Sequence, residues 1–374
     1  MIMMNDNQRN YEEHNQQIDG NRSRDIDSMN RLLNDPYQDH NHELLQQPQQ
    51  EGYIDPRDRN LKPYQGILFI LGIFISYLGL SFGLSLIMPR SLSFYATILL
   101  QLWFIAAPLL FVICMKRNLR GVFPFHKPAW SGIGGTVVLW IGTFMVNIAM
   151  SGTLAYLFPA ASGNTSMQLW DMIADIPAIL LILVIAVMPA IGEELTFRGV
   201  FLNSLTGIRY PILAALLVGI VFGAFHMDLV KLLPTGMIGI LLCVMLQDSG
   251  NMIYNSFLHF LNNFVSVALL ILVRAMAQVI PAYDQLMEQS LQQSAQMTLA
   301  GVGLYWIMGC AGPFLIYLGL WLVKRTKKNY RKSFFPKETR ARDLILVIGA
   351  TVLMLFIGFL CLVIGVLQMT PYIG

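Results

Sequence analysis

The sequence predicts an all-α protein, a polytopic bundle of about eight or nine transmembrane helices behind a disordered polar N-terminal tail. Three observations predict it. Of the 374 residues, 55% are hydrophobic and 13% are charged, whereas about 25% of the residues in a typical soluble protein are charged. The charges are concentrated at the start, where residues 1–64 hold 12 acidic and 7 basic side chains. After residue 64, the apolar residues form runs long enough to cross a bilayer.

The composition also excludes several classes of protein. Residues 65–374 carry only 10 acidic and 18 basic side chains, too few to solvate a soluble domain of this length. A nucleic-acid-binding protein would need basic clusters on a water-facing surface, so we expect no nucleic-acid partner. The 4 cysteines lie in apolar segments without CxxC spacing, which predicts neither a disulfide framework nor a thiolate zinc site.

The first segment, residues 1–64, contains 9 Asn and 8 Gln and few large apolar residues. Such a composition buries too little apolar surface to offset the entropy of ordering the chain. We therefore predict a disordered tail over 1–64 and a transmembrane domain over 65–374. The tail has no continuous apolar stretch that would indicate a secretory signal.

The transmembrane domain divides into apolar runs, each predicted to be a helix because a backbone in lipid must satisfy its own hydrogen bonds. A span needs about 20 residues to cross the ~30 Å hydrocarbon core. The predicted spans cover residues 66–88, 93–115, 132–158, 176–204, 211–228, 232–247, 251–273, 302–323 and 343–368. The sixth of these is short and the fourth is long.

The basic residues of the connections predict the orientation. Segment 116–127 carries four Lys or Arg residues and segment 324–342 carries nine, whereas 159–175 and 275–300 have acidic residues and no basic ones. Both basic segments are cytoplasmic if the N-terminus is cytoplasmic, and nine spans then place the C-terminus outside the cytoplasm. The basic segment at 324–342 could also attract anionic lipid head groups.

Five ionisable residues lie inside the apolar runs: Glu193, Glu194, Arg198, His226 and His259. Burying a charged residue in a membrane costs about 2.5–3.5 kcal/mol on insertion scales, and such residues are usually functional. Glu194 and Arg198 are four residues apart and share a helix face, so they can neutralise each other. Glu193 points about 100° away from that face and is left without this partner.

The remaining polar residues fall at comparable depths. His259 and Asn263 are also four residues apart, as are Phe222 and His226. If the fourth and fifth runs form a hairpin, Glu193 lies about 17 Å and His226 about 22 Å from its turn, at 1.5 Å per residue. One buried polar cavity, reached from the cytoplasm, can therefore hold all of these side chains.

This set of residues suits amide hydrolysis by an activated water molecule. A carboxylate shielded from water can act as a general base, and His and Asn can donate hydrogen bonds to an oxyanion. A Glu with two His could instead bind zinc, although no HExxH motif is present. A purely structural role is also open, because Glu–Arg pairs, His and Asn often only tie membrane helices together.

Three motifs occur in order on separate runs: residues 193–198 read EExxxR, residues 222–226 read FxxxH and residues 259–263 read HxxxN. This order resembles the CAAX prenyl protease and bacteriocin-processing (CPBP, or Abi) family of intramembrane glutamate proteases. The resemblance covers a catalytic core of about residues 176–270. The polar tail and the ninth run depart from a minimal eight-span member of the family.

The resemblance implies a role for each matched residue. Glu193 would activate the water with help from His226, and His259 and Asn263 would stabilise the oxyanion. The supporting positions would be Glu194, Arg198 and Phe222. The family was long labelled as metalloproteases, and we follow the metal-free glutamate mechanism, so no cofactor is expected.

The predicted function is that of an intramembrane endopeptidase, a multi-pass membrane hydrolase acting on a membrane-associated peptide or protein within the lipid bilayer. A non-catalytic membrane scaffold or bacteriocin-immunity protein with the same fold is the alternative. A transporter, in which buried Glu and His would relay protons, is less consistent with the sequence because no paired half-length spans indicate inverted repeats.

Overall fold

A computed structural model describes residues 60–89, 92–162, 176–279, 297–327, 330 and 332–369. The chain divides into two units, Met1–Asp55 and Pro56–Gly374, and all of these residues belong to the second. The tail predicted over 1–64 therefore lies almost entirely outside the described residues. The acidic side chains predicted between the spans at 159–175 and 275–300 lie outside them as well.

Every element in the described part of the chain is a helix, which confirms the predicted all-α bundle. Eight helices are long and apolar enough to cross a membrane, and one apolar helix is shorter. The long ones are α3 (Pro63–Ile87), α4 (Ser93–Cys114), α6 (Trp130–Leu157), the composite helix Ala178–Leu202, α11 (Leu229–Ser249), α12 (Met252–Val279), α14 with α15 (Leu299–Gly309 and Gly312–Lys324) and α16 (Arg340–Met369). The shorter one is α10 (Pro211–Phe225), and a single turn, α5 (Leu119–Val122), lies between α4 and α6.

The lengths of α10 and α11 differ from the prediction of a full fifth span and a short sixth one. α10 has 15 residues and α11 has 21. α10 ends early because Met227 adopts a φ of 49° and Asp228 caps α11 by accepting a hydrogen bond from the Val230 N–H at 2.9 Å. Hydropathy alone does not show that a charged residue caps the next helix, so the end of α10 was predicted too late. His226 therefore lies at the C-terminal end of α10 and not within a span.

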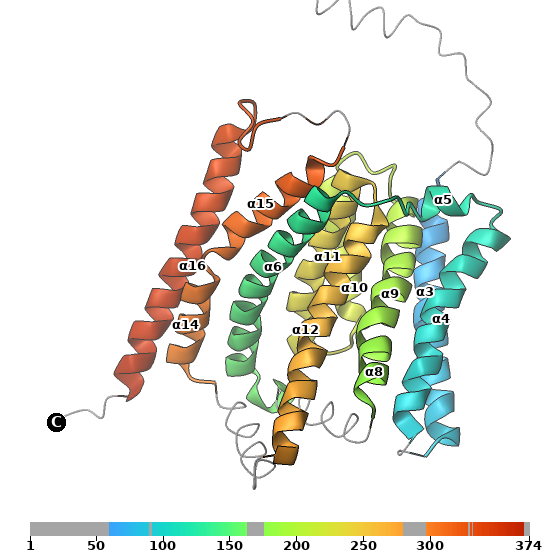
Figure 1. Cartoon of the computed structure of the whole chain (residues 1–374), viewed down its shortest axis with the longest axis horizontal. Coiled ribbons are helices and arrows are strands. Elements are labelled where there is room, and N and C mark those ends of the chain that lie inside the picture. Colours follow the sequence, from blue (N-terminus) through green and yellow to red (C-terminus); the bar gives the residue numbers. More distant parts are fainter. Residues whose placement is uncertain are drawn as a thin grey trace, which may run out of the picture. The chain divides into compact units, whose positions relative to one another are not determined.

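The composite helix lies in the interior of this part of the bundle, surrounded by other helices. Half of its most apolar window is buried, against 11% for α16, and it packs against α3, α4, α10, α11 and α12. In Figure 1 its label α9 lies between α12 and α4. Its successive segments are α8 (Ala178–Leu181), η3 (Ile182–Val187), α9 (Met188–Glu193) and η4 (Glu194–Leu202).

On the other side of the bundle, α6 and α15 approach each other backbone to backbone. Gly135 and Gly142 of α6 face Gly312 and Gly319 of α15. A methyl group on Gly319 would lie only 2.4 Å from the backbone nitrogen of Leu139. Small residues allow membrane helices to pack this closely, because lipid supplies no hydrophobic force to hold them together.

The two basic connections lie at one end of the bundle, the upper end in Figure 1. The backbone N–H of His126 donates to Asn251 Oδ1 at 3.1 Å, and Lys327 Nζ donates to the Gln247 carbonyl at 3.3 Å. These bonds join one connection to the turn between α11 and α12 and the other to the last turn of α11. The predicted topology requires this arrangement, because it places both basic segments on one side of the membrane.

Candidate active site

The helix that carries the two glutamates departs from α-helical geometry on both sides of them. η3 and η4 are π-helical, and α9 lies between them. Glu193 is the last residue of α9 and Glu194 is the first of η4. Segments of π-helix are rare and occur often at functional sites. The winding of the helix therefore changes between the two glutamates.

Glu194 belongs to a buried charge network. Arg198 Nη1 donates to Glu194 Oε1 at 3.1 Å, and both side chains are fully buried. Arg198 Nη2 donates to the carbonyl of Gly239 on α11 at 3.0 Å, and its guanidinium carbon lies 4.5 Å from the ring centroid of Phe222. The contact expected from the four-residue spacing is therefore present, and it also connects the composite helix to α10 and α11.

His259 joins this network from α12. Its Nδ1 lies 2.8 Å from Glu194 Oε1, and its Nε2 lies 3.7 Å from Glu193 Oε2. Because a carboxylate oxygen accepts, Nδ1 carries the hydrogen, and Glu194 fixes both the tautomer and the orientation of the ring. Glu194 is thus bound by both Arg198 and His259. The sequence predicted only the first of these two contacts.

Glu193 and His226 line the same small pocket, with a volume of about 160 Å³. His226 Nδ1 lies 3.0 Å from the carbonyl oxygen of Phe222. A carbonyl oxygen can only accept, so Nδ1 carries the hydrogen and Nε2 is left as an acceptor. The other residues that line the pocket are Tyr77, Gln101, Phe104, Phe197, Phe222, Phe225 and Met227.

Phe222 packs against three polar members of the site. Its ring centroid lies 5.3 Å from that of His226 and 5.9 Å from that of His259, with near-perpendicular planes. Arg198 covers it as well. Phe222 is itself buried. This side chain contacts both histidine rings and so restricts the positions that they can take.

The pocket lining does not include His259, whose Nε2 nevertheless lies 3.7 Å from Glu193 Oε2, and it does not include the fourth predicted catalytic residue, Asn263, either. Asn263 lies one helical turn beyond His259 on α12 and is half-buried. Its Oδ1 accepts a hydrogen bond from Asn262 Nδ2 at 3.2 Å.

Three polar residues near the site escaped the sequence analysis. Tyr77 and Gln101 line the pocket beside Glu193, and Gln101 Oε1 and Glu193 Oε2 are buried without a hydrogen-bond partner among the described residues. Asn255 is fully buried four residues before His259 and donates to the Leu242 carbonyl at 2.7 Å. Gln101 could have been recognised as a polar residue within an apolar run. Asn255 could have been recognised by its position four residues before His259.

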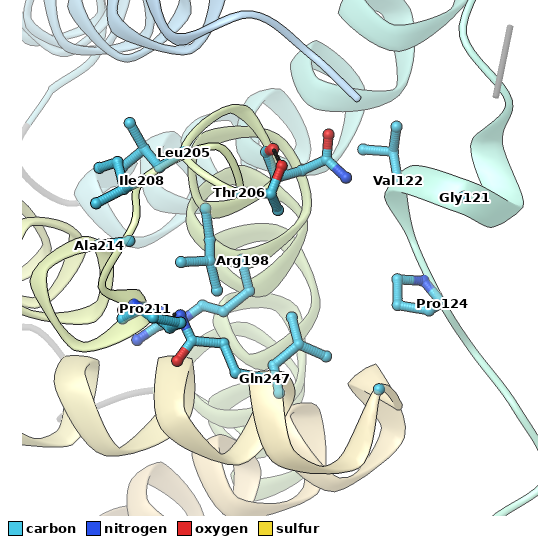
Figure 2. A pocket seen from close by; sticks show the side chains of 14 residues that line it. Gly121, Val122, Pro124, Arg198, Leu205, Thr206, Ile208, Pro211, Ala214 and Gln247 are labelled. Carbon is cyan, nitrogen blue, oxygen red and sulfur yellow. Dashed lines mark hydrogen bonds between the residues drawn. The ribbon is translucent and has the colours of Figure 1, made fainter. Parts of the chain in front are cut away.

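A different pocket, of about 310 Å³, lies beside Arg198. Figure 2 shows Arg198 among Pro211, Gln247 and Thr206, with mostly apolar side chains around them. Neither glutamate and neither histidine lines it. The residues suited to hydrolysis therefore place the candidate active site in the smaller pocket. In the part of the chain that the structure describes, no group of three or more His, Cys, Asp or Glu side chains is arranged to hold a metal ion.

The comparison with protein families agrees with the motifs. Residues 175–265 match the family model described as type II CAAX prenyl endopeptidase Rce1-like. The matched segment contains the composite helix, α10, α11 and the first half of α12, with all three motifs. No curated protein and no solved structure matches the chain. The resemblance to the CAAX prenyl protease family is confirmed through this segment.

Proposed function

We propose, from the Rce1-like match over residues 175–265, that the chain is an intramembrane endopeptidase that hydrolyses a peptide bond of a membrane-associated substrate. One observation carries the proposal: Glu193 and His226 share a small pocket within a bundle of apolar helices, and His259 lies against Glu193. These are a base, its partner and a hydrogen-bond donor, the groups that hydrolysis by water needs.

In the proposed reaction, Glu193 takes a proton from a water molecule while the water oxygen bonds to the carbonyl carbon of the substrate. His226 holds the same water through Nε2, the nitrogen that its tautomer leaves free to accept. The proton then passes to the peptide nitrogen as the C–N bond breaks. The products are a carboxylic acid and an amine, and Glu193 is regenerated as a carboxylate.

The carbonyl oxygen becomes an oxyanion in this step, and His259 stabilises it from Nε2. Glu194 accepts the Nδ1 hydrogen of the same ring at 2.8 Å and so orients it, and donation from Nε2 requires that Nε2 carry a hydrogen as well. Arg198 balances the charge of Glu194, and Phe222 keeps the rings in place. Asn263, one turn from His259, supplies the second donor once substrate is bound.

The proposed reaction uses no metal, and a chelator tests this directly. Cleavage by the full-length protein should continue unchanged in strong chelator. If chelator abolishes cleavage and added zinc restores it, the zinc alternative replaces the glutamate mechanism.

The decisive test replaces Glu193 with Gln in the full chain, purified into lipid vesicles with membrane-anchored peptides, prenylated and unprenylated. Glu193→Gln removes the base and keeps the shape of the side chain, so we expect cleavage to fall by about a hundredfold or more. Glu338→Gln makes the same chemical change at an exposed position in the 324–342 connection and should leave the rate unchanged. Undiminished cleavage by Glu193→Gln would contradict the mechanism. A wild-type chain that cleaves neither peptide class would favour the non-catalytic scaffold.

A further inference from the structure

A second polar pocket lies at the basic end of the bundle, away from the candidate active site. It has a volume of about 350 Å³ and lies between the C-terminal ends of α11 and α15 and the segment that leads into α16. Its lining includes six charged side chains: Lys324, Lys327, Lys332, Arg342, Asp248 and Asp343.

One wall of this pocket comes from the described residues 332–339 of the connection. Trp321 Nε1 donates to the Ser333 carbonyl at 3.2 Å, and the Tyr317 hydroxyl donates to the Phe334 carbonyl at 2.8 Å. The Phe334 ring also lies 5.2 Å, between centroids, from both Tyr317 and Trp321. These contacts fix residues 333–334 against α15, beside the pocket.

Each carboxylate in the pocket is already bound by a cation. Asp248 Oδ2 lies 3.1 Å from Lys324 Nζ. Asp343 Oδ1 lies 3.0 Å from Arg342 Nη2, and its Oδ2 accepts from the Thr339 hydroxyl at 2.7 Å. Four cations and two carboxylates line the pocket, so Lys327 and Lys332 leave it with an excess of two positive charges. Both of these lysines are exposed. Lys327 donates one hydrogen bond to the Gln247 carbonyl, and its ammonium group has two further hydrogens that a ligand can accept.

The position of the pocket identifies the class of ligand. Both α15, which ends at Lys324, and α16, which begins at Arg340, are parts of predicted membrane spans. A pocket between these ends lies at the level of lipid head groups, and Tyr and Trp side chains such as Tyr317 and Trp321 are typical of that level. Basic pockets between helix ends bind the phosphates of anionic lipids. We propose that this pocket binds the phosphate group of an anionic lipid head group.

The test compares two variants that remove equal charge from the full-length protein. Lys327→Gln with Lys332→Gln changes the pocket, and Lys337→Gln with Arg340→Gln changes exposed residues of the same connection that do not line it. Native mass spectrometry from detergent measures bound phosphatidylglycerol against phosphatidylcholine. At about 1 kcal/mol for each basic residue, the pocket variant should bind phosphatidylglycerol about thirtyfold more weakly. The control variant should lose only a few-fold, and neither should change phosphatidylcholine binding.

Three outcomes would overturn the proposal. Equal losses in the two variants would mean that the connection attracts lipid only through its overall charge. Equal binding of the two lipids by the wild type would mean that the pocket does not recognise an anionic head group. Displacement of phosphatidylglycerol by excess inorganic phosphate, with retention of phosphate itself, would assign the pocket to free phosphate. Matched unfolding temperatures verify that both variants are folded, and peptide cleavage plays no part in the readout.

Discussion

Two adjacent glutamates have different surroundings in this protein. Glu194 is fully buried, with Arg198 at 3.1 Å and His259 at 2.8 Å. Glu193 lies at the pocket, partly exposed, with His259 at 3.7 Å. A step of one residue along a helix turns the side chain by about 100°, so one glutamate faces the charge network and the other faces the pocket. Two successive glutamates can therefore place one carboxylate in a buried charge network and the other at a pocket.

The buried network predicts a specific pattern of stability. Arg198→Met leaves the charge of Glu194 buried with less compensation, which should cost about 3–5 kcal/mol. Combining it with Glu194→Gln removes both charges, so the double variant should recover much of that loss. Unfolding temperatures of the purified proteins in detergent measure the difference. If Arg198→Met alone is as stable as the double variant, the charges of Arg198 and Glu194 are not coupled.

At the residue scale, the sequence predicted the pair of Glu194 and Arg198 because both lie on one helix, where spacing determines proximity. It could not predict that His259 bonds to Glu194, since these two residues lie on different helices and are 65 positions apart in the chain. It expected Asn263 at the site from the same four-residue rule. The structure places Asn263 one turn from His259 but outside the pocket lining. The spacing of residues in the sequence shows which of them share a face of a helix. It does not show which residues of other helices that face contacts.

At the element scale, the existence of the apolar helices follows from hydropathy, and their irregularities do not. The π-helical segments η3 and η4 were not predicted, because a pattern of apolar residues does not record a local change of helical winding. The early end of α10 depends on the positive φ of Met227 and the cap at Asp228. These irregular positions are where the polar residues of the site lie, at Glu193, Glu194 and His226.

Neighbouring glycines on α6 offer a test of helix packing. An added methyl group on Gly135 would lie 2.7 Å from Leu322 Cβ and 2.9 Å from the Val323 nitrogen, whereas one on Gly134 meets no atom within 4 Å. Gly135→Ala should therefore force α6 and α15 apart and destabilise the protein by about 1–3 kcal/mol. Gly134→Ala should be neutral or stabilising, because Ala favours a helix over Gly by up to about 1 kcal/mol.

Unfolding temperatures of these two alanine variants give the comparison, with the unchanged protein as reference. Since the substitutions are identical in chemistry and adjacent in the chain, a difference between them reports the contact with α15. If Gly134→Ala lowers the unfolding temperature as much as Gly135→Ala does, close packing of these helices is not what limits stability.

At the scale of the whole molecule, charge and hydropathy predicted the bundle and the grouping of the basic connections. The sequence could do this because few charges remain outside the first 64 residues, so each charge in a connection carries information about sidedness. The arrangement of the helices around the composite helix was not predictable in the same way. It depends on glycine contacts and on one central charge network, which form only when the helices meet.

The last prediction concerns the two ends of the chain. The Leu61 N–H donates to Asn203 Oδ1 at 3.1 Å, which places the start of α3 at the basic end, and α16 runs from that end to the opposite one (Figure 1). α10 covers only about 22 Å, less than the ~30 Å hydrocarbon core. It nevertheless carries the chain back across the bundle between η4 and α11. The number of such crossings determines on which side of the membrane the C-terminus lies.

We therefore expect a reporter that fluoresces only in the cytoplasm to be bright at the N-terminus and dark at the C-terminus. A small epitope inserted after Lys337, in the connection between α15 and α16, should be protected from outside reagents in intact cells, because that connection is basic and should remain cytoplasmic. Reporters of equal brightness at both ends would mean that the chain changes sides an even number of times, which would contradict the nine-helix path. A bright C-terminus with a dark N-terminus would mean that the path is correct and the whole bundle is inverted.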